Sequence, residues 1–280
     1  MLNPLTVKAA GHPVLISNAN RMPALRTFGI KERERMRKVI LHYHLFKNAG
    51  TSLDAAFKEN VAPEEWVTQE FPGEPQTNRE QVAQWILDNP QAKIFSSHTA
   101  HLPPPKFEGV EVLPVIFMRH PIDRIASAYA FETKQGGDSF GAVLARNTDL
   151  SGYIETRLSL PHDRQCRNFH MQRLAMMFGG NQGDEFTRSK KALETLPFVG
   201  IVEQFADSMA RLEKWLQSEG FGGMQLKPVE KNVSRDIKKS LEDKLKEFQE
   251  RISPEVFAKL TEANRNDLVL YHFAVESVGD

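Results

Sequence analysis

The sequence has very little cysteine, since Cys166 is the only one among 280 residues. An intrachain disulfide is therefore impossible, and a reducing compartment is the default expectation. The residues around Cys166 do not form the pattern of a known cysteine nucleophile, so we expect a small buried side chain. No apolar run is long enough to span a bilayer, and the polar N-terminal stretch is unlike a signal peptide. The sequence thus predicts a cytoplasmic protein without a membrane span.

Neither sign of charge is in excess, because 36 Lys and Arg residues face 36 Asp and Glu residues. A global basic field that would attract nucleic acid is excluded, and any anion site must be local. Gly/Ser linkers and internal repeats are also missing, while 40% of the residues are hydrophobic. We therefore expect a single domain over residues 38–280, preceded by an arm, residues 1–37, that packs on it. The pattern gives no indication of the oligomeric state.

Strand patterns alternate with helix patterns along the chain. Strands are expected at residues 38–46, 92–99, 110–121 and 198–202, and helices at residues 51–58, 78–90, 121–134 and 205–219. This alternation predicts an α/β fold, a P-loop-like parallel sheet with helices on both faces. Pro114 is awkward for a central strand. Ligands of such sheets bind beyond the carboxyl ends of the strands, where FKNAGTS, SSHTAH and MRHPIDR are expected to converge.

The first of these segments combines Lys47 with two hydroxyl residues at the start of a helix. A helix N-terminus offers unpaired N–H groups and a positive dipole end, so the segment predicts an anion site. In the usual nucleotide-binding loop the Lys follows the second Gly, whereas Lys47 precedes Gly50. Taken by itself, the segment is explained equally well by a capped helix beside a surface lysine, without a bound anion.

Two segments together resemble one family. FKNAGTSL resembles the 5′-phosphosulfate loop of sulfotransferases that use 3′-phosphoadenosine 5′-phosphosulfate (PAPS), and MRHPIDRIASAY resembles their 3′-phosphate motif. The nearest group is that of the carbohydrate sulfotransferases of the heparan 2-O type with their bacterial relatives. The resemblance implies PAPS as donor, 3′-phosphoadenosine 5′-phosphate (PAP) as product, no metal, and a hydroxyl-bearing acceptor such as a glycan or small alcohol.

The resemblance also implies roles for individual residues. Catalysis would rest on Lys47 at the phosphosulfate and on His98 as the general base, with His101 as the alternative base. The donor would be bound by Lys47, Asn48, Ala49, Gly50, Thr51, Ser52, Arg119, Ser127, Lys231, Asn232 and Ser234. The acceptor would meet His101, Arg167 and Arg173, the two arginines lying with Arg164 in an expected helix.

Simpler explanations stay open for several of these residues. Arg119 could pair with Asp123, Ser127 could face solvent, and the arginines could form a solvated basic surface. His42 and His44 are expected to be packed or hydrogen-bonded inside. A P-loop-type kinase is the alternative enzyme, although no acidic residue ends the third strand. A non-catalytic nucleotide-binding protein is the other alternative.

Overall fold

The computed structural model of this protein describes residues 36–227 and 239–279. Its compact unit begins at Arg37. The expected N-terminal arm and three expected donor ligands, Lys231, Asn232 and Ser234, lie outside the described residues. Among the described helices, none has both the length and the apolar character needed to cross a membrane.

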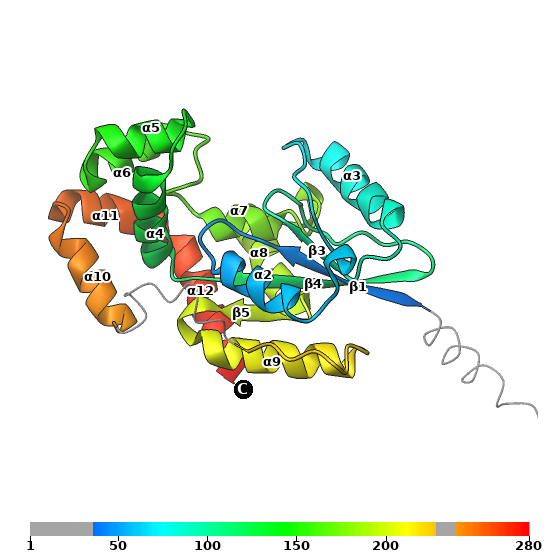
Figure 1. The fold of residues 1–280 in the computed structure, drawn as a ribbon. Helices are drawn as coiled ribbons and strands as arrows, with labels where there is room; N and C mark the ends of the chain where they lie inside the picture. The colour runs from blue at the N-terminus through cyan, green and yellow to red at the C-terminus, as the bar shows by residue number, and fades with distance from the viewer. Residues whose placement is uncertain (1–35, 228–238, 280) are drawn as a thin grey trace, which may run out of the picture. The chain divides into compact units, whose positions relative to one another are not determined.

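A parallel five-stranded sheet forms the centre of the fold, in the order β2-β3-β1-β4-β5 (Figure 1). Its strands are β1 (Arg37–Tyr43), β2 (Trp66–Thr68), β3 (Ile94–Ser97), β4 (Val110–Met118) and β5 (Val199–Ile201). The predicted α/β fold is confirmed, although β2 was not predicted. The strands are shorter than expected, and β1 ends before His44, which therefore lies in the loop.

Helices cover both faces of the sheet (Figure 1). The described helices are α2 (Gly50–Lys58), α3 (Pro75–Asp88), α4 (Pro121–Lys134), α5 (Phe140–Asn147), α6 (Leu150–Ser159), α7 (Phe169–Ala175), α8 (Glu185–Thr195), α9 (Phe205–Ser218), α10 (Leu241–Glu250), α11 (Pro254–Ala263) and α12 (Arg265–Gly279). Of these, α5, α6, α10 and α11 lie away from the sheet (Figure 1). Short 3₁₀ turns lie at Pro63–Glu65, Gly180–Gln182 and Val202–Gln204. The expected helix containing Arg164 and Arg167 is wrong, because α7 begins only at Phe169 and both arginines lie in the preceding loop.

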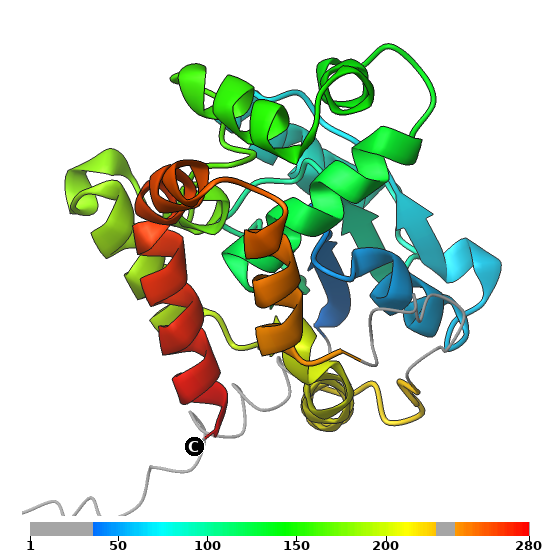
Figure 2. The same cartoon turned by 90° about the vertical axis from the view of Figure 1, so that its left-hand side faces the viewer.

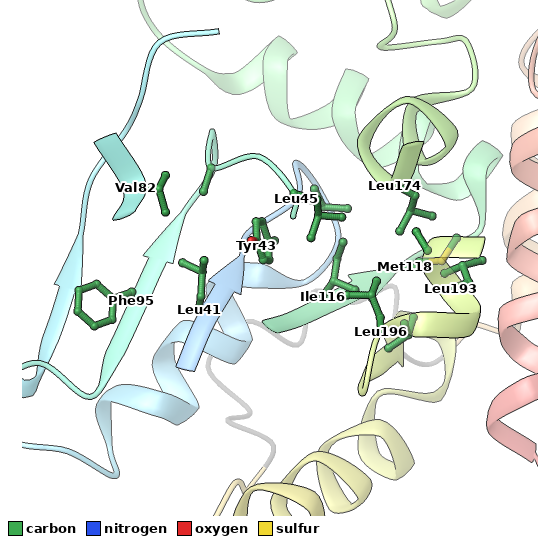
Figure 3. Packing of buried hydrophobic residues seen from close by; sticks show 14 of the residues in the cluster. Leu41, Tyr43, Leu45, Val82, Phe95, Ile116, Met118, Leu174, Leu193 and Leu196 are labelled. Carbon is green, nitrogen blue, oxygen red and sulfur yellow. The ribbon is translucent and has the colours of Figure 1, made fainter. Parts of the chain in front are cut away.

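Alternating side chains of the central strands divide the core into two clusters. Leu41 and Ile116 point into the cluster that α3, α7, α8 and α12 cover (Figure 3). Ile40 and Val115 point into the opposite cluster, which α2 and α9 cover. Because successive strand residues face opposite sides, a strand buried on both faces needs an unbroken apolar run. The β4 sequence VIFM meets this requirement, as does the β1 sequence VIL, which is followed by the polar His42.

Pro114 fits into β4 because of the length of the neighbouring strand. It is paired with Leu41 of β1 on one side. On the other side, β5 pairs only with residues from Ile116 to Met118 and so does not reach Pro114. A proline is tolerated in a strand where no neighbour needs its missing N–H. Pro114 is therefore compatible with its position in the sheet because β5 is short.

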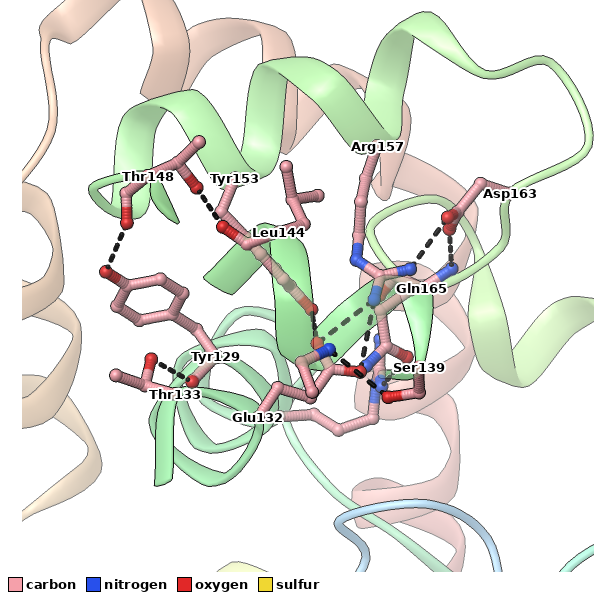
Figure 4. Close-up of polar contacts among 12 residues, drawn as sticks. Tyr129, Glu132, Thr133, Ser139, Leu144, Thr148, Tyr153, Arg157, Asp163 and Gln165 are labelled. Atoms are coloured by element: carbon pink, nitrogen blue, oxygen red, sulfur yellow. Dashed lines mark hydrogen bonds and ion pairs between the residues drawn. The ribbon is translucent and has the colours of Figure 1, made fainter. Parts of the chain in front are cut away.

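A third apolar cluster joins α4 and α6 to the C-terminal helices α10 and α11 (Figure 2). Beside it lies a buried polar network (Figure 4), in which Tyr153 donates to Glu132 at 2.5 Å. Arg157 bonds Glu132 at 3.0 Å and Asp163 at 2.7 Å. A Cβ at Gly141 would lie 2.2 Å from the Glu132 carboxylate, so only glycine fits there. These contacts hold α4, whose first turn follows the third strand-end segment.

Candidate active site

The turn between β1 and α2 has an unusual backbone. Lys47 and Ala49 have φ angles of 62° and 59°, in the left-handed region that residues other than glycine rarely adopt. Alternation of left-handed and ordinary residues builds the concave backbone nests that bind anions. Within the described ranges, the N–H groups of Gly50 and Thr51 have no acceptor, as expected at a helix start. The turn could therefore hold an anion with its backbone.

Gly50 is fixed by a close approach of His44. A Cβ at Gly50 would lie 2.0 Å from Cδ2 of the His44 ring, which no side chain permits. The hydroxyl groups of Thr51 and Ser52 follow in the first turn of α2, and the structure assigns neither a partner among the described residues. Both remain available at the helix N-terminus.

Asn48 has a different role from the expected ligand, because its side chain is buried and turned into the protein. Its Oδ1 lies 2.9 Å from Nε2 of His170, and its Nδ2 donates to the Phe46 carbonyl at 3.0 Å. Asp267 in turn accepts the backbone N–H groups of His170 and Met171 at 2.9 and 2.7 Å. The C-terminal helix thus supports the turn through α7. The backbone N–H of Asn48, which was expected to face the anion, instead donates to the Leu45 carbonyl at 3.1 Å.

The ammonium group of Lys47 forms no ion pair with a carboxylate in the described part of the chain. Its Nζ lies 4.5 Å from the centre of the Phe131 ring. Burial, followed by the charge of Arg119, lowers the pKa of Lys47. The two neighbouring cations repel each other, so a bound anion would stabilise both.

Arg119 lies between the first and third strand-end segments. Its Nε donates to Asp123 at 2.6 Å, and one Nη donates to the Lys47 carbonyl at 3.2 Å. The expected pairing with Asp123 is therefore present, but it leaves the second Nη without a partner among the described residues. Ser127 is half-buried two turns along α4. By contrast, Arg124 is fully buried and donates to Gln165, so it belongs to the protein interior.

His98 follows β3 at the same edge of the sheet and is exposed. Its Nδ1 lies 3.1 Å from the carbonyl oxygen of His44, which can only accept a hydrogen bond. The proton of neutral His98 is therefore on Nδ1, and Nε2 is free to accept another. Burial, followed by the charge of His44, lowers the pKa of His98, while Glu70 acts in the opposite direction. His98 is thus a neutral base near pH 7.

His101 and Arg173 lie deeper. His101 is 5% exposed, and its Nδ1 has no partner among the described residues. Burial lowers its pKa to about 4, with further contributions from the charges of Arg173 and Arg79. The Nε of Arg173 is also buried without a partner in the described part of the chain. Burial also lowers the pKa of Arg173, and its half-buried guanidinium has no carboxylate partner among the described residues.

Arg167 does not reach this region. Its guanidinium donates to the carbonyls of Leu158, Leu160 and Pro161, at the end of α6. Arg164 pairs with Glu185 at 3.2 Å. The expected acceptor role of Arg167 is therefore corrected: its donors satisfy helix-end carbonyls that would otherwise lack partners. Cys166 is buried, and burial raises the pKa of its thiol to about 12, which makes it unreactive.

Comparison with known proteins adds two similarities. Residues 35–274 match the protein family described as "Sulfotransferase family". The chain is also similar to a protein of Archaeoglobus fulgidus that is described only as uncharacterized. The two are 38% identical over 248 residues, which is 86% of this chain and 97% of that protein. The family match extends over the sheet and its strand-end segments.

Proposed function

The chain belongs to the sulfotransferase family, and from this premise we propose that it transfers a sulfuryl group from PAPS to an acceptor hydroxyl, releasing PAP. The proposal rests on one observation: Lys47, Arg119 and His98 lie at the same edge of the sheet. Arg119 bonds the carbonyl of Lys47 at 3.2 Å, and His98 bonds the carbonyl of His44, three residues earlier, at 3.1 Å. These contacts between neighbouring backbone segments support a site at which two cations bind the donor and a neutral base meets the acceptor.

On the donor side, the β1–α2 turn holds the phosphosulfate. The Lys47 ammonium and the N–H groups of Gly50 and Thr51 face the anion, with the hydroxyls of Thr51 and Ser52 beside them. Arg119 and Ser127 hold the 3′-phosphate. Fixed cations and amides act where negative charge grows on the leaving phosphate, without reorganising during the reaction. No metal is needed for this stabilisation.

On the acceptor side, His98 removes the proton. The acceptor oxygen attacks sulfur in line with the bond to the leaving phosphate, its proton passes to Nε2 of His98, and the S–O bond to PAP breaks. The His44 carbonyl stabilises the Nδ1–H of His98 before and after the transfer. A positioned base of this kind contributes about a hundred- to ten-thousandfold to the rate.

The acceptor is proposed to be acidic. Arg173 lacks a counter-ion within the described ranges, and its charge acts on buried His101. Arg79 adds a second positive charge toward His101. A carboxylate, sulfate or phosphate group on the acceptor would satisfy Arg173 by charge-assisted hydrogen bonds. An acidic glycan fits this description better than a neutral alcohol.

The test combines donor and acceptor. Purified protein is incubated with PAPS labelled in the sulfuryl group and with matched acidic and neutral glycans, and products are analysed by mass spectrometry. We expect an added sulfate on an acidic glycan, and thermal stabilisation by PAP well above that by AMP. Equal stabilisation by AMP and PAP would contradict the donor assignment. Phosphate transfer from ATP would instead support a kinase.

A further inference from the structure

A largely buried polar cluster lies beside His98, and its side chains take no part in the reaction described above. At its centre, Oδ1 of Asp54 lies 2.7 Å from Nδ1 of His42, and Oδ2 lies 2.9 Å from Nδ1 of His44. The hydroxyl of Ser96 donates to Oδ1 at 2.9 Å. The cluster joins the end of β1, the first turns of α2 and the end of β3.

The charge of Asp54 fixes how these groups are protonated. Burial by itself would raise the pKa of Asp54, but the charge of His42 and hydrogen bonds from His42 and His44 outweigh it and hold the pKa well below its ordinary value. An ionised carboxylate only accepts hydrogen bonds, so both Nδ1 atoms carry protons. The hydrogen bond from Nδ1 of His44 to Asp54 therefore holds the His44 ring in one orientation, because donor and acceptor cannot exchange roles.

His44 in turn contacts His98 in two ways. The centres of the two rings are 3.8 Å apart, with 42° between their planes. The backbone carbonyl of His44 accepts a hydrogen bond from Nδ1 of His98 at 3.1 Å. The backbone N–H of His44 donates to the carbonyl of Ser97 at 2.9 Å. The ring of His44 thus fixes the plane of the His98 ring, and the carbonyl of His44 fixes the tautomer of His98.

Packing alone gives no reason for this arrangement. Replacing an enclosed ion pair by apolar side chains of similar volume is often neutral or stabilising, so the half-buried Asp54 carboxylate with two buried histidines is not required for stability. The cluster lies directly under the proposed base, and one of its rings touches that base. Similar supporting carboxylates fix the tautomer and orientation of working histidines elsewhere.

We propose that Asp54 and His44 are a positioning pair that holds His98 with its Nε2 toward the acceptor hydroxyl. The proposal rests on the proposed function, in which His98 is the base. Asp54 and His44 are not catalytic residues in this scheme, because neither accepts the acceptor's proton. They determine how often His98 is correctly placed when the acceptor binds.

Asp54→Asn is the main test, because it keeps the shape of the side chain and removes its charge. We expect kcat to fall about 10- to 100-fold, the usual effect of losing a supporting partner of a functional histidine. The KM for PAPS and the Kd for PAP should stay unchanged. Glu59→Gln is the matched control, since it removes an exposed carboxylate just beyond the end of the same helix.

A double-mutant cycle separates positioning from general structural damage. If Asp54 acts through His98, adding Asp54→Asn to His98→Ala should cause no further loss of the residual rate. An independent additional loss, or a parallel loss of PAP binding, would overturn the proposal. A His98→Ala variant with normal activity would instead contradict the proposed function itself.

Ser96→Ala provides a second test that does not alter α2. It removes one hydrogen bond to Asp54 and should lower kcat by a smaller factor, again only when His98 is present. This variant decides the question if Asp54→Asn does not fold. Normal kcat in a folded Ser96→Ala protein would refute the positioning role, as would normal kcat in a folded Asp54→Asn protein.

Discussion

Arg119 is bonded to Asp123 and to the backbone of Lys47 at the same time, at 2.6 and 3.2 Å. The side chain therefore links two segments that are 72 residues apart in sequence. Asp123 is buried and fixes Nε, so the outer edge of the guanidinium keeps a defined direction. An arginine held in this way is ready to form a forked contact with a phosphate.

Arg119→Ala and Lys47→Ala should affect different kinetic constants. Loss of Arg119 removes a charge-assisted contact with the 3′-phosphate, so the Kd for PAP should rise by about one to two orders of magnitude. Loss of Lys47 should mainly lower kcat, because its charge acts on the leaving phosphate. Steady-state kinetics with varied PAPS and calorimetric titration of PAP measure both effects. Lys47→Ala with normal turnover would refute its assigned role.

Asp123→Asn is the control for the Arg119 variant. Its amide oxygen can still accept from Nε, so the PAP affinity should decrease less than in Arg119→Ala. An Asp123→Asn protein that binds PAP more weakly than Arg119→Ala would mean that Asp123, and not Arg119, determines nucleotide binding.

Local patterns predicted the strand-end segments, and the reason is physical. An apolar run, the polar turn residues after it and the start of a helix all lie in consecutive residues, as in FKNAGTS after β1. Parallel pairing then places β3, β1 and β4 side by side. The position of His98 beside His44 follows from this pairing, since His44 donates its N–H to Ser97.

Contacts between distant residues were not predictable in the same way. Asn48 appeared to be a ligand because it lies in the turn, yet its side chain bonds His170, 122 residues later. Arg167 lay near other arginines in sequence, but it bonds helix-end carbonyls. Such partners depend on how α7 and α12 pack and leave no periodic signal. The polar residues within the apolar β1 and β3 runs, His42 and Ser96, were the only available sign of the Asp54 cluster.

His170→Phe tests the support of the β1–α2 turn. The ring fills similar space but leaves Oδ1 of buried Asn48 without its donor, so the free energy of unfolding should fall by about 1–3 kcal/mol. PAP affinity should also fall, because the turn that binds the phosphosulfate loses its anchor. Urea denaturation and calorimetry measure the two effects. His170→Gln, which retains a donor, should recover part of both, and failure of PAP affinity to change would contradict the anchoring role.

The buried His101 should make stability depend on pH. Its pKa is about 4 in the folded protein against a model value of 6.5, so the unfolded chain binds the extra proton between these values. Stability is therefore fully present above pH 6.5 and decreases as the pH falls toward 4. His101→Gln should reduce the slope of unfolding free energy in this range by about 1.4 kcal/mol per pH unit, the value for one proton. Chemical denaturation at several pH values measures it, and identical slopes in both proteins would contradict burial of neutral His101.

His98→Ala separates proton removal from donor binding. Without the base, kcat should fall about a hundred- to ten-thousandfold, whereas the Kd for PAP should not change, since His98 contacts the acceptor side.

The pKa of His98 is lowered from 6.5 by burial, so the wild-type rate should be constant near neutral pH and fall only below about pH 6.5, where Nε2 becomes protonated. Profiles of kcat/KM against pH measure this acid limb. His101→Ala is the matched control and should retain the acid limb, because His101 is not the proposed base. If His101→Ala is inactive while His98→Ala works normally, the base lies three residues further along the chain and the exposed His98 only supports it.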